Sequence, residues 1–215
     1  MKFKNTSTFL LLIILACTVS TLAFADAVVG VKQGDWVEYN ATFTGKPPAE
    51  HDVVWAKMEV LGVEGQRVNA TFETRLANGT MLNVTEDLDF STGKFIDMFI
   101  IPAGQNAGDS FYAHNVGVIT IDSVSVRTVA GAARTIVHAD AEDTQWFWDR
   151  ATGVVVEAHT ANSVYTLDTA AVTTGLWSPQ ILWLDEPFFY ALLIVAAIVI
   201  VMALVLGVRR KRKTR

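Results

Sequence analysis

Near the C-terminus, twenty-one consecutive residues from Phe188 to Val208 carry no charged side chain. At a rise of about 1.5 Å per residue, a helix of this length covers the roughly 30 Å hydrocarbon core of a bilayer. Six basic residues follow within 209–215, and such residues stay on the cytoplasmic side of a membrane. We therefore predict a transmembrane helix over 187–208 and a cytoplasmic basic tail over 209–215, with the preceding region outside the cell.

The N-terminal segment 1–25 has the parts of a secretory signal peptide: two early lysines, an apolar stretch, and small residues ending at Ala25. We expect cleavage after Ala25. Two alternatives are an uncleaved membrane helix and acylation of Cys17 after a lipoprotein-like sequence. At the other end, an alternative is that the apolar segment and the basic cluster belong to a processed sorting signal.

Between these ends lie residues 26–186, which are enough for one domain with its own core. They contain no cysteine, which excludes a disulfide framework, a thiol nucleophile and a thiolate metal site. They carry 9 Lys and Arg against 22 Asp and Glu, a net charge of −13. Such a surface repels phosphate backbones, so we expect no nucleic-acid partner. We divide this region into a β domain at 26–174 and a juxtamembrane linker at 175–186.

Alternation of apolar and polar residues recurs along the region, and no stretch sustains a helical period. Short turn sequences separate most of the alternating segments, which favours antiparallel neighbours. The sequence therefore predicts an all-β outer domain, a curved antiparallel meander of about ten strands that forms a half-barrel, a barrel or a folded-over sheet. The predicted strands are 35–44, 53–63, 67–76, 80–90, 94–101, 117–129, 133–140, 144–149, 154–160 and 163–173.

One predicted hairpin allows its register to be chosen. Opposing Phe72 with Val84 and Val68 with Leu88 keeps apolar residues together and requires a three-residue loop over 77–79. We expect Gly79 to take the left-handed bulge position of that loop.

The pattern D-x-x-T-G occurs twice between predicted strands, from Asp89 to Gly93 and from Asp149 to Gly153. The Asp side chain can accept backbone N–H groups of the turn, and Gly supplies the positive φ that closes it. We assign these residues a structural role. Asp87 and Asp89 also suggest a calcium loop, but the sixth and twelfth positions lack the glycine and the acid that an EF-hand requires.

The order of turn residues is the same in the two halves of the region. A Gly-Asp dipeptide at 34–35, a turn at Gly65 and a D-x-x-T-G follow one another in the first half. Gly-Asp at 108–109, a turn at Gly131 and the second D-x-x-T-G repeat this order. A tandem duplication is one explanation, and coincidence of common turn residues is the other.

The phrases G-D-W-V-E-Y at 34–39 and W-D-x-x-T-G-V at 148–154 resemble those of uncharacterised archaeal surface proteins that share this order of signal peptide, β-rich outer domain and C-terminal membrane anchor. The resemblance implies the layout of the chain. It implies no activity.

No catalytic signature was found in the chain, and we expect no enzyme activity, no cofactor and no metal site. The four histidines are His51, His114, His138 and His159. The last two are on predicted neighbouring strands with Asp140 close by, so a metal site there is an alternative. Trp146 and Trp148 share a strand face, either as core residues or as an exposed platform for a sugar or lipid.

Four sequons of the N-x-[ST] type lie in the exported region, at Asn40, Asn69, Asn78 and Asn83. The strand pattern and the hairpin register place all four side chains toward solvent. We therefore expect a glycoprotein if the host has the machinery.

Together these features predict a membrane-anchored, non-enzymatic cell-surface module that binds an unidentified envelope protein, glycan or lipid. One alternative is a carrier or sensor that holds a lipid-like ligand in the curved sheet, and a surface hydrolase is a third. A large apolar cavity would favour the carrier, a filled core the module, and clustered histidines and carboxylates the enzyme.

Overall fold

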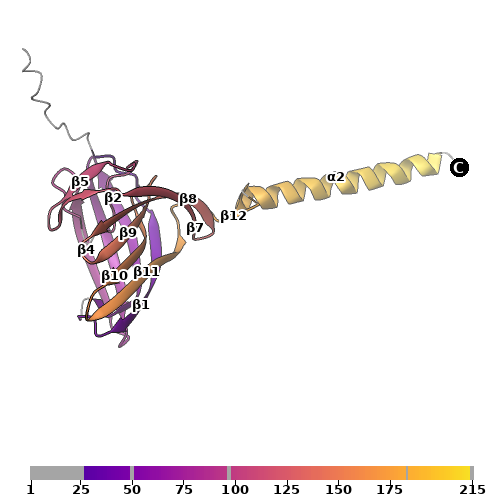
Figure 1. The fold of residues 1–215 in the computed structure, drawn as a ribbon. Coiled ribbons are helices and arrows are strands. Elements are labelled where there is room, and N and C mark those ends of the chain that lie inside the picture. The colour runs from indigo at the N-terminus through magenta and orange to yellow at the C-terminus, as the bar shows by residue number, and fades with distance from the viewer. Residues whose placement is uncertain (1–26, 49–50, 96–97, 183, 214–215) are drawn as a thin grey trace, which may run out of the picture.

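A computed structural model describes residues 27–48, 51–95, 98–182 and 184–213, with side chains described to Met202 (Figure 1). The predicted signal peptide and the cleavage after Ala25 lie outside the described residues. The chain forms a β domain followed by one helix. The elements are β1 (Trp36–Gly45), β2 (Val53–Glu64), β3 (Arg67–Leu76), β4 (Met81–Asp89), β5 (Ser110–Ala113), β6 (Gly117–Thr120), β7 (Ser123–Val129), β8 (Ala132–Ala141), β9 (Thr144–Asp149), β10 (Val155–Ala161), β11 (Tyr165–Thr174), β12 (Gln180–Ile181), β13 (Leu184–Asp185) and α2 (Glu186–Lys213).

Nine strands form one antiparallel sheet in the order β4-β3-β2-β1-β11-β10-β9-β8-β7. Two runs of sequence neighbours, β1 to β4 and β7 to β11, meet where β1 pairs with β11. The sheet is curved but does not close, so β4 and β7 lie at its edges (Figure 1). The predicted all-β antiparallel class is confirmed, and the closed barrel is excluded. The single meander is only partly right, because the first and last long strands pair in the middle of the sheet.

One face of the sheet, called here the inner face, packs against the crossover that joins β4 to β7, residues 90–122. The crossover includes the small β5–β6 hairpin. Its apolar side chains share one buried cluster with inner-face residues such as Tyr39 and Trp148. The crossover thus fills the space that the curved sheet encloses. Its buried members in this cluster are Phe90, Phe95, Met98, Ile100, Ile101, Phe111, Ala113, Ile119 and Ile121.

The strand predicted at 94–101 is wrong, since the described residues of that segment form isolated bridges at Lys94 and Ile100 instead of a strand. The segment has the composition of a buried strand because it lies in the core. Its described residues bury apolar side chains at odd and even positions alike, as Phe95, Met98, Ile100 and Ile101 show. The strand predicted at 117–129 is divided into β6 and β7, and β5 was missed.

The β3–β4 register is the one predicted, with Phe72 opposite Val84 and Val68 opposite Leu88. The connecting loop holds Gly79 at a φ of 87°. Burial of an apolar face at Val68 and Leu88, both fully buried, selects this register because a one-residue slip would expose them.

The Gly-Asp turns at 34–35 and 108–109 make the same backbone bonds. Each Gly N–H donates to one later residue, to Val60 at 2.9 Å in the first half and to Ile121 at 2.8 Å in the second. That same residue donates its N–H back to the Asp carbonyl, at 2.8 and 2.9 Å. This shared bonding agrees with a tandem duplication, which stays a prediction beside coincidence of common turn residues.

Helix α2 begins directly after β13 and extends away from the sheet (Figure 1). A search of the described residues finds no helix with a stretch long and apolar enough to cross a membrane. The transmembrane segment predicted at 187–208 therefore stays a prediction.

Two glycines with positive φ provide a test of the turn chemistry. A Cβ at Gly153 (φ 73°) would collide with the carbonyl oxygen of Ile101, whereas a Cβ at Gly79 (φ 87°) would meet open space. We expect Gly153→Ala to lower the free energy of unfolding by about 3 kcal/mol, from backbone strain and overpacking together, and Gly79→Ala by about 1 kcal/mol from strain alone. Chemical denaturation of the two variants measures both. Equal losses would contradict the packing of the crossover against the second D-x-x-T-G turn.

Candidate functional site

The four sequons lie on one side of the first half of the sheet. Asn40, Asn69 and Asn83 point to the outer face, opposite the crossover, and Asn78 lies in the β3–β4 loop. The Asn69 amide donates to Asp87 Oδ1 at 2.6 Å, and Asn83 Oδ1 accepts from the Thr71 hydroxyl at 2.9 Å. Asn40, Asn78 and Asn83 are exposed, and Asn69 is half-buried.

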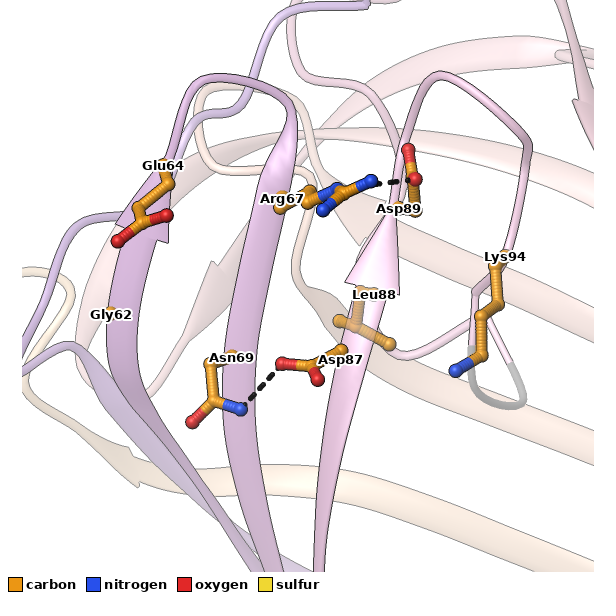
Figure 2. Close-up of a pocket in the computed structure, with 8 residues that line it drawn as sticks. All are labelled: Gly62, Glu64, Arg67, Asn69, Asp87, Leu88, Asp89 and Lys94. Carbon is orange, nitrogen blue, oxygen red and sulfur yellow. Dashed lines mark hydrogen bonds and ion pairs between the residues drawn. The ribbon is translucent and has the colours of Figure 1, made fainter.

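A groove of about 460 Å³, lined mainly by charged and polar residues that include Asn69, lies over the ends of β2, β3 and β4 (Figure 2). Arg67 and Lys94 are its basic residues, and their side chains are 75% and 55% exposed. Arg67 contacts Asp89 at 3.4 Å, so most of its guanidinium remains accessible to a ligand. The groove therefore offers cationic donors and carboxylate acceptors side by side. Its lining residues are Gly62, Glu64, Arg67, Asn69, Asp87, Leu88, Asp89 and Lys94.

Asp89 closes the first D-x-x-T-G turn with its side chain. Its carboxylate accepts from the Ser91 backbone N–H at 3.0 Å and from the Ser91 hydroxyl, and Gly93 has a φ of 70°. The hydroxyl bond lowers the pKa of the Asp89 carboxyl, so the groove keeps this negative charge at neutral pH. Asp87 and Asp89 belong to no group of three potential ligand side chains within 4.8 Å among the described residues, so the structure adds no support for the suggested calcium loop.

Asp149 also closes its turn with its side chain, but it accepts from Thr152 where Asp89 accepts from Ser91, and it is fully buried. Its carboxylate accepts from the Thr152 N–H at 3.0 Å and from Arg134 through two bonds of 2.9 and 3.0 Å. Trp177 lies over the Arg134 guanidinium at 4.5 Å. This pair is satisfied inside the protein and offers no open binding surface, in contrast to Arg67 and Asp89.

The histidines are dispersed over the sheet and its loops. His51 contacts the Tyr165 hydroxyl, His159 contacts Asp168, and His114 is exposed. The expectation that His138 and His159 lie on neighbouring strands is wrong, because β9 lies between β8 and β10. The metal site suggested for that pair is therefore not formed.

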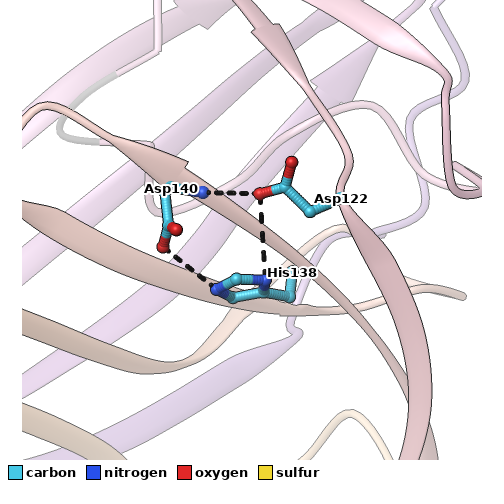
Figure 3. A group of neighbouring side chains, drawn as sticks. All are labelled: Asp122, His138 and Asp140. Atoms are coloured by element: carbon cyan, nitrogen blue, oxygen red, sulfur yellow. Dashed lines mark hydrogen bonds and ion pairs between the residues drawn. The ribbon is translucent and has the colours of Figure 1, made fainter.

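His138 instead lies between two carboxylates on the outer face, beside edge strand β7 (Figure 3). Its Nδ1 is 3.9 Å from Asp122 Oδ2, and its Nε2 is 3.2 Å from Asp140 Oδ1. The Asp140 backbone N–H donates to Asp122 Oδ2 at 3.0 Å. Within the described part of the chain, this is the one group of three potential metal-ligating side chains whose ligand atoms all lie within 4.8 Å of one another. We call it the Asp122–His138–Asp140 triad.

Sequence reasoning missed Asp122, Arg67 and Lys94 as site residues. Asp122 lies at the break between β6 and β7, where the sequence predicted one continuous strand. The two basic residues were read as ordinary surface positions, because no local motif marks a groove assembled from three strands and a turn.

Trp146 and Trp148 pack in the core and do not form the exposed platform that was the alternative. Trp148 is fully buried, and its indole N–H donates to the Met98 carbonyl at 2.8 Å. Trp146 stacks on Trp148 with ring centroids 5.9 Å apart, and its own buried N–H has no hydrogen-bond partner among the described residues.

A smaller apolar cavity of about 260 Å³ remains on the inner face beside β4. Phe72 and Phe99 line it together with Tyr39 and Val84. Burial raises the pKa of the Tyr39 phenol, which stays neutral and donates to the Val155 carbonyl at 2.9 Å. The cavity therefore presents few polar groups to an occupant.

No protein-family model matches the chain, and no curated protein is significantly similar to it. The assignment of a function therefore rests on the residues and their geometry.

Proposed function

We propose that this protein is a non-enzymatic cell-surface module, anchored by α2 in the membrane, that binds a polar component of the envelope. The observation that carries the proposal is the arrangement of the β domain: its inner face is filled by its own crossover, while an open polar groove lies over β2, β3 and β4. Because the inner face is covered, we expect the domain to bind partners through its exposed outer surface. We expect the groove to be the contact surface.

The groove suits a polar ligand for a physical reason. Arg67 presents a planar guanidinium that can donate several bonds at once, and Lys94 adds a mobile ammonium. Glu64, Asp87 and Asp89 supply acceptors for hydroxyl or amide groups. Such mixed donors and acceptors match an envelope glycan or a polar protein loop better than an acyl chain.

The membrane anchor is supported by the surface of α2. Its large apolar side chains from Leu192 to Met202 are each more than half exposed. From Phe188 to Met202 the helix carries no charged side chain on any face, and such a surface is stable when protein or lipid covers it. With six basic residues after Val208, the proposed orientation places the β domain outside the cell.

A carrier of a lipid-like ligand is the second candidate, and the apolar cavity beside Phe99 is the observation that favours it. The cavity lies against the edge strand, where Leu82 and Val84 are 45% and 50% exposed. Its volume of about 260 Å³ is below the usual range for drug-sized ligands. The third candidate, a hydrolase, gains no support from these two cavities, because neither is lined by the Asp122–His138–Asp140 triad.

Protease treatment of intact cells tests the orientation. We expect external protease to degrade the β domain and to leave a membrane-protected fragment that contains α2 and the basic tail. Immunoblotting with an epitope tag on the C-terminus follows that fragment. Protection of the whole protein until the cells are lysed would reverse the proposed topology.

Charge removal in the groove tests the binding surface. Full-length protein in lipid nanodiscs is titrated with purified envelope polysaccharide and with solubilised envelope proteins of the host. We expect Arg67→Ala combined with Lys94→Ala to weaken binding at least about tenfold, since charged anchor residues carry much of the energy of an interface. Lys32→Ala is the matched control, because Lys32 is 79% exposed and lies outside the groove. Unchanged binding by the double variant would remove the groove from the proposal.

A further inference from the structure

The Asp122–His138–Asp140 triad combines one imidazole with two carboxylates. Their exposed fractions are 18% for the His138 side chain and 52% and 61% for those of Asp122 and Asp140. The ring is therefore held in the protein surface, while the two acids face solvent and can adjust. A ligand from solution can reach all three.

Packing fixes the orientation of the imidazole. The His138 ring stacks on Phe147, with centroids 4.6 Å apart and an interplanar angle of 30°. Arg127 lies against the same Phe147 ring at 4.1 Å, and Glu157 neutralises its charge at 2.6 Å. The aromatic platform thus holds the histidine edge toward the two aspartates.

The two Gly-Asp turns share a backbone arrangement that does not depend on the triad residues. Val60 and Ile121 occupy equivalent positions, because each exchanges two backbone bonds with a Gly-Asp turn. The next residue is Leu61 in the first half and Asp122 in the second. The same backbone arrangement is therefore built with an apolar side chain at this position.

His138 and Asp140 also have counterparts in the first half, and these counterparts are not metal-ligating residue types. The residue before each D-x-x-T-G turn pairs with a valine of the preceding strand. Counting on from that valine, His138 and Asp140 correspond to Asn69 and Thr71. A strand at this place thus forms without imidazole or carboxylate, and the second half has gained three potential ligands at neighbouring positions.

We propose that Asp122, His138 and Asp140 bind one divalent transition-metal ion, for which Zn²⁺ is the probe. One imidazole nitrogen and two carboxylate oxygens are a donor set that such ions accept, with solvent completing the coordination. The separation of 3.2 Å between His138 Nε2 and Asp140 Oδ1 is close to the roughly 3.3 Å that two ligands adopt around tetrahedral zinc. Asp122 Oδ2 faces the other ring nitrogen, 3.9 Å from Nδ1, and accepts from the Asp140 N–H, so this side chain, which is 52% exposed, must rotate to reach an ion on Nε2. The proposal is independent of the groove and of the membrane anchor.

Charge and ligand type set the expected selectivity. Two carboxylates compensate the charge of a divalent ion, and the net negative charge of the β domain attracts it. Because Mg²⁺ and Ca²⁺ prefer oxygen ligands in larger number, an imidazole-containing site with three protein ligands should bind them much more weakly.

Isothermal titration calorimetry of the full-length protein tests the site. The protein is purified in mild detergent without a histidine tag and stripped with EDTA. We expect saturable one-to-one binding of Zn²⁺ at micromolar concentration, and no comparable binding of Mg²⁺. Asp140→Asn should weaken Zn²⁺ binding at least about tenfold, and because this side chain is 61% exposed, its replacement leaves the core intact.

His159→Ala is the matched control, because His159 contacts a single carboxylate, Asp168, on the same sheet face. It should bind Zn²⁺ like the unaltered protein, whereas His138→Gln should follow Asp140→Asn. If His138→Gln fails to fold, the Asp140→Asn result decides alone. Absence of saturable Zn²⁺ binding below millimolar concentration would overturn the proposal. Equal losses from His159→Ala and Asp140→Asn would overturn it as well.

Discussion

The structure depends on covering the inner face of an open, curved sheet. Nine strands that do not close leave a large apolar surface, and the chain covers it with its own crossover at 90–122. A row of edge-to-face aromatic contacts runs from Phe90 through Phe95 and Phe111 to Trp148, with centroid distances of 5.2, 5.9 and 6.2 Å. Each fully buried large apolar side chain contributes about 1.5–3 kcal/mol, so this segment is a main source of stability.

Because the crossover fills the interior, the proposed binding sites lie on the outside of the domain. The apolar cavity that remains is small, whereas the groove at Arg67 and the triad at His138 both lie where ligands arrive from solvent. The two places share a backbone pattern, since Asn69 and His138 each follow the valine that pairs with the residue before a D-x-x-T-G turn. One place carries a groove with mixed charge, and the other a compact set of potential metal ligands.

Much of the fold followed from local patterns in the sequence. Alternation and turn residues predicted most strands of the large sheet, and the rule that apolar faces must oppose one another gave the β3–β4 register, including Phe72 opposite Val84. The segment 94–101 was wrongly predicted to be a strand because irregular chain that fills a core carries apolar residues at odd and even positions, as a strand buried on both faces does. Sequence pattern alone cannot distinguish such a segment from such a strand.

The candidate sites were largely beyond sequence reasoning. The pairing of β1 with β11 is a long-range contact that no local pattern indicates. His138 and His159 were placed on neighbouring strands although the predicted strand 144–149 lies between them in the sequence, and Asp122 was hidden inside a strand predicted to be continuous. For Trp146 and Trp148, alternation placed both on one face but left open whether that face was the core or an exposed platform, and the burial of Trp148 decides for the core.

The central claim, that the crossover is a permanent part of the core and not a lid over a ligand cavity, is tested by hydrogen exchange of the native protein. Mass spectrometry resolves peptides from the crossover and from the central pair β1 and β11. Segments that open only on global unfolding exchange at a common slow limit. We predict that amides of Ile101, Ile119 and Ile121 are protected to the same degree as those of β1. Fast exchange across the crossover while β1 and β11 remain protected would contradict this account and would identify the protein as a carrier with a movable lid.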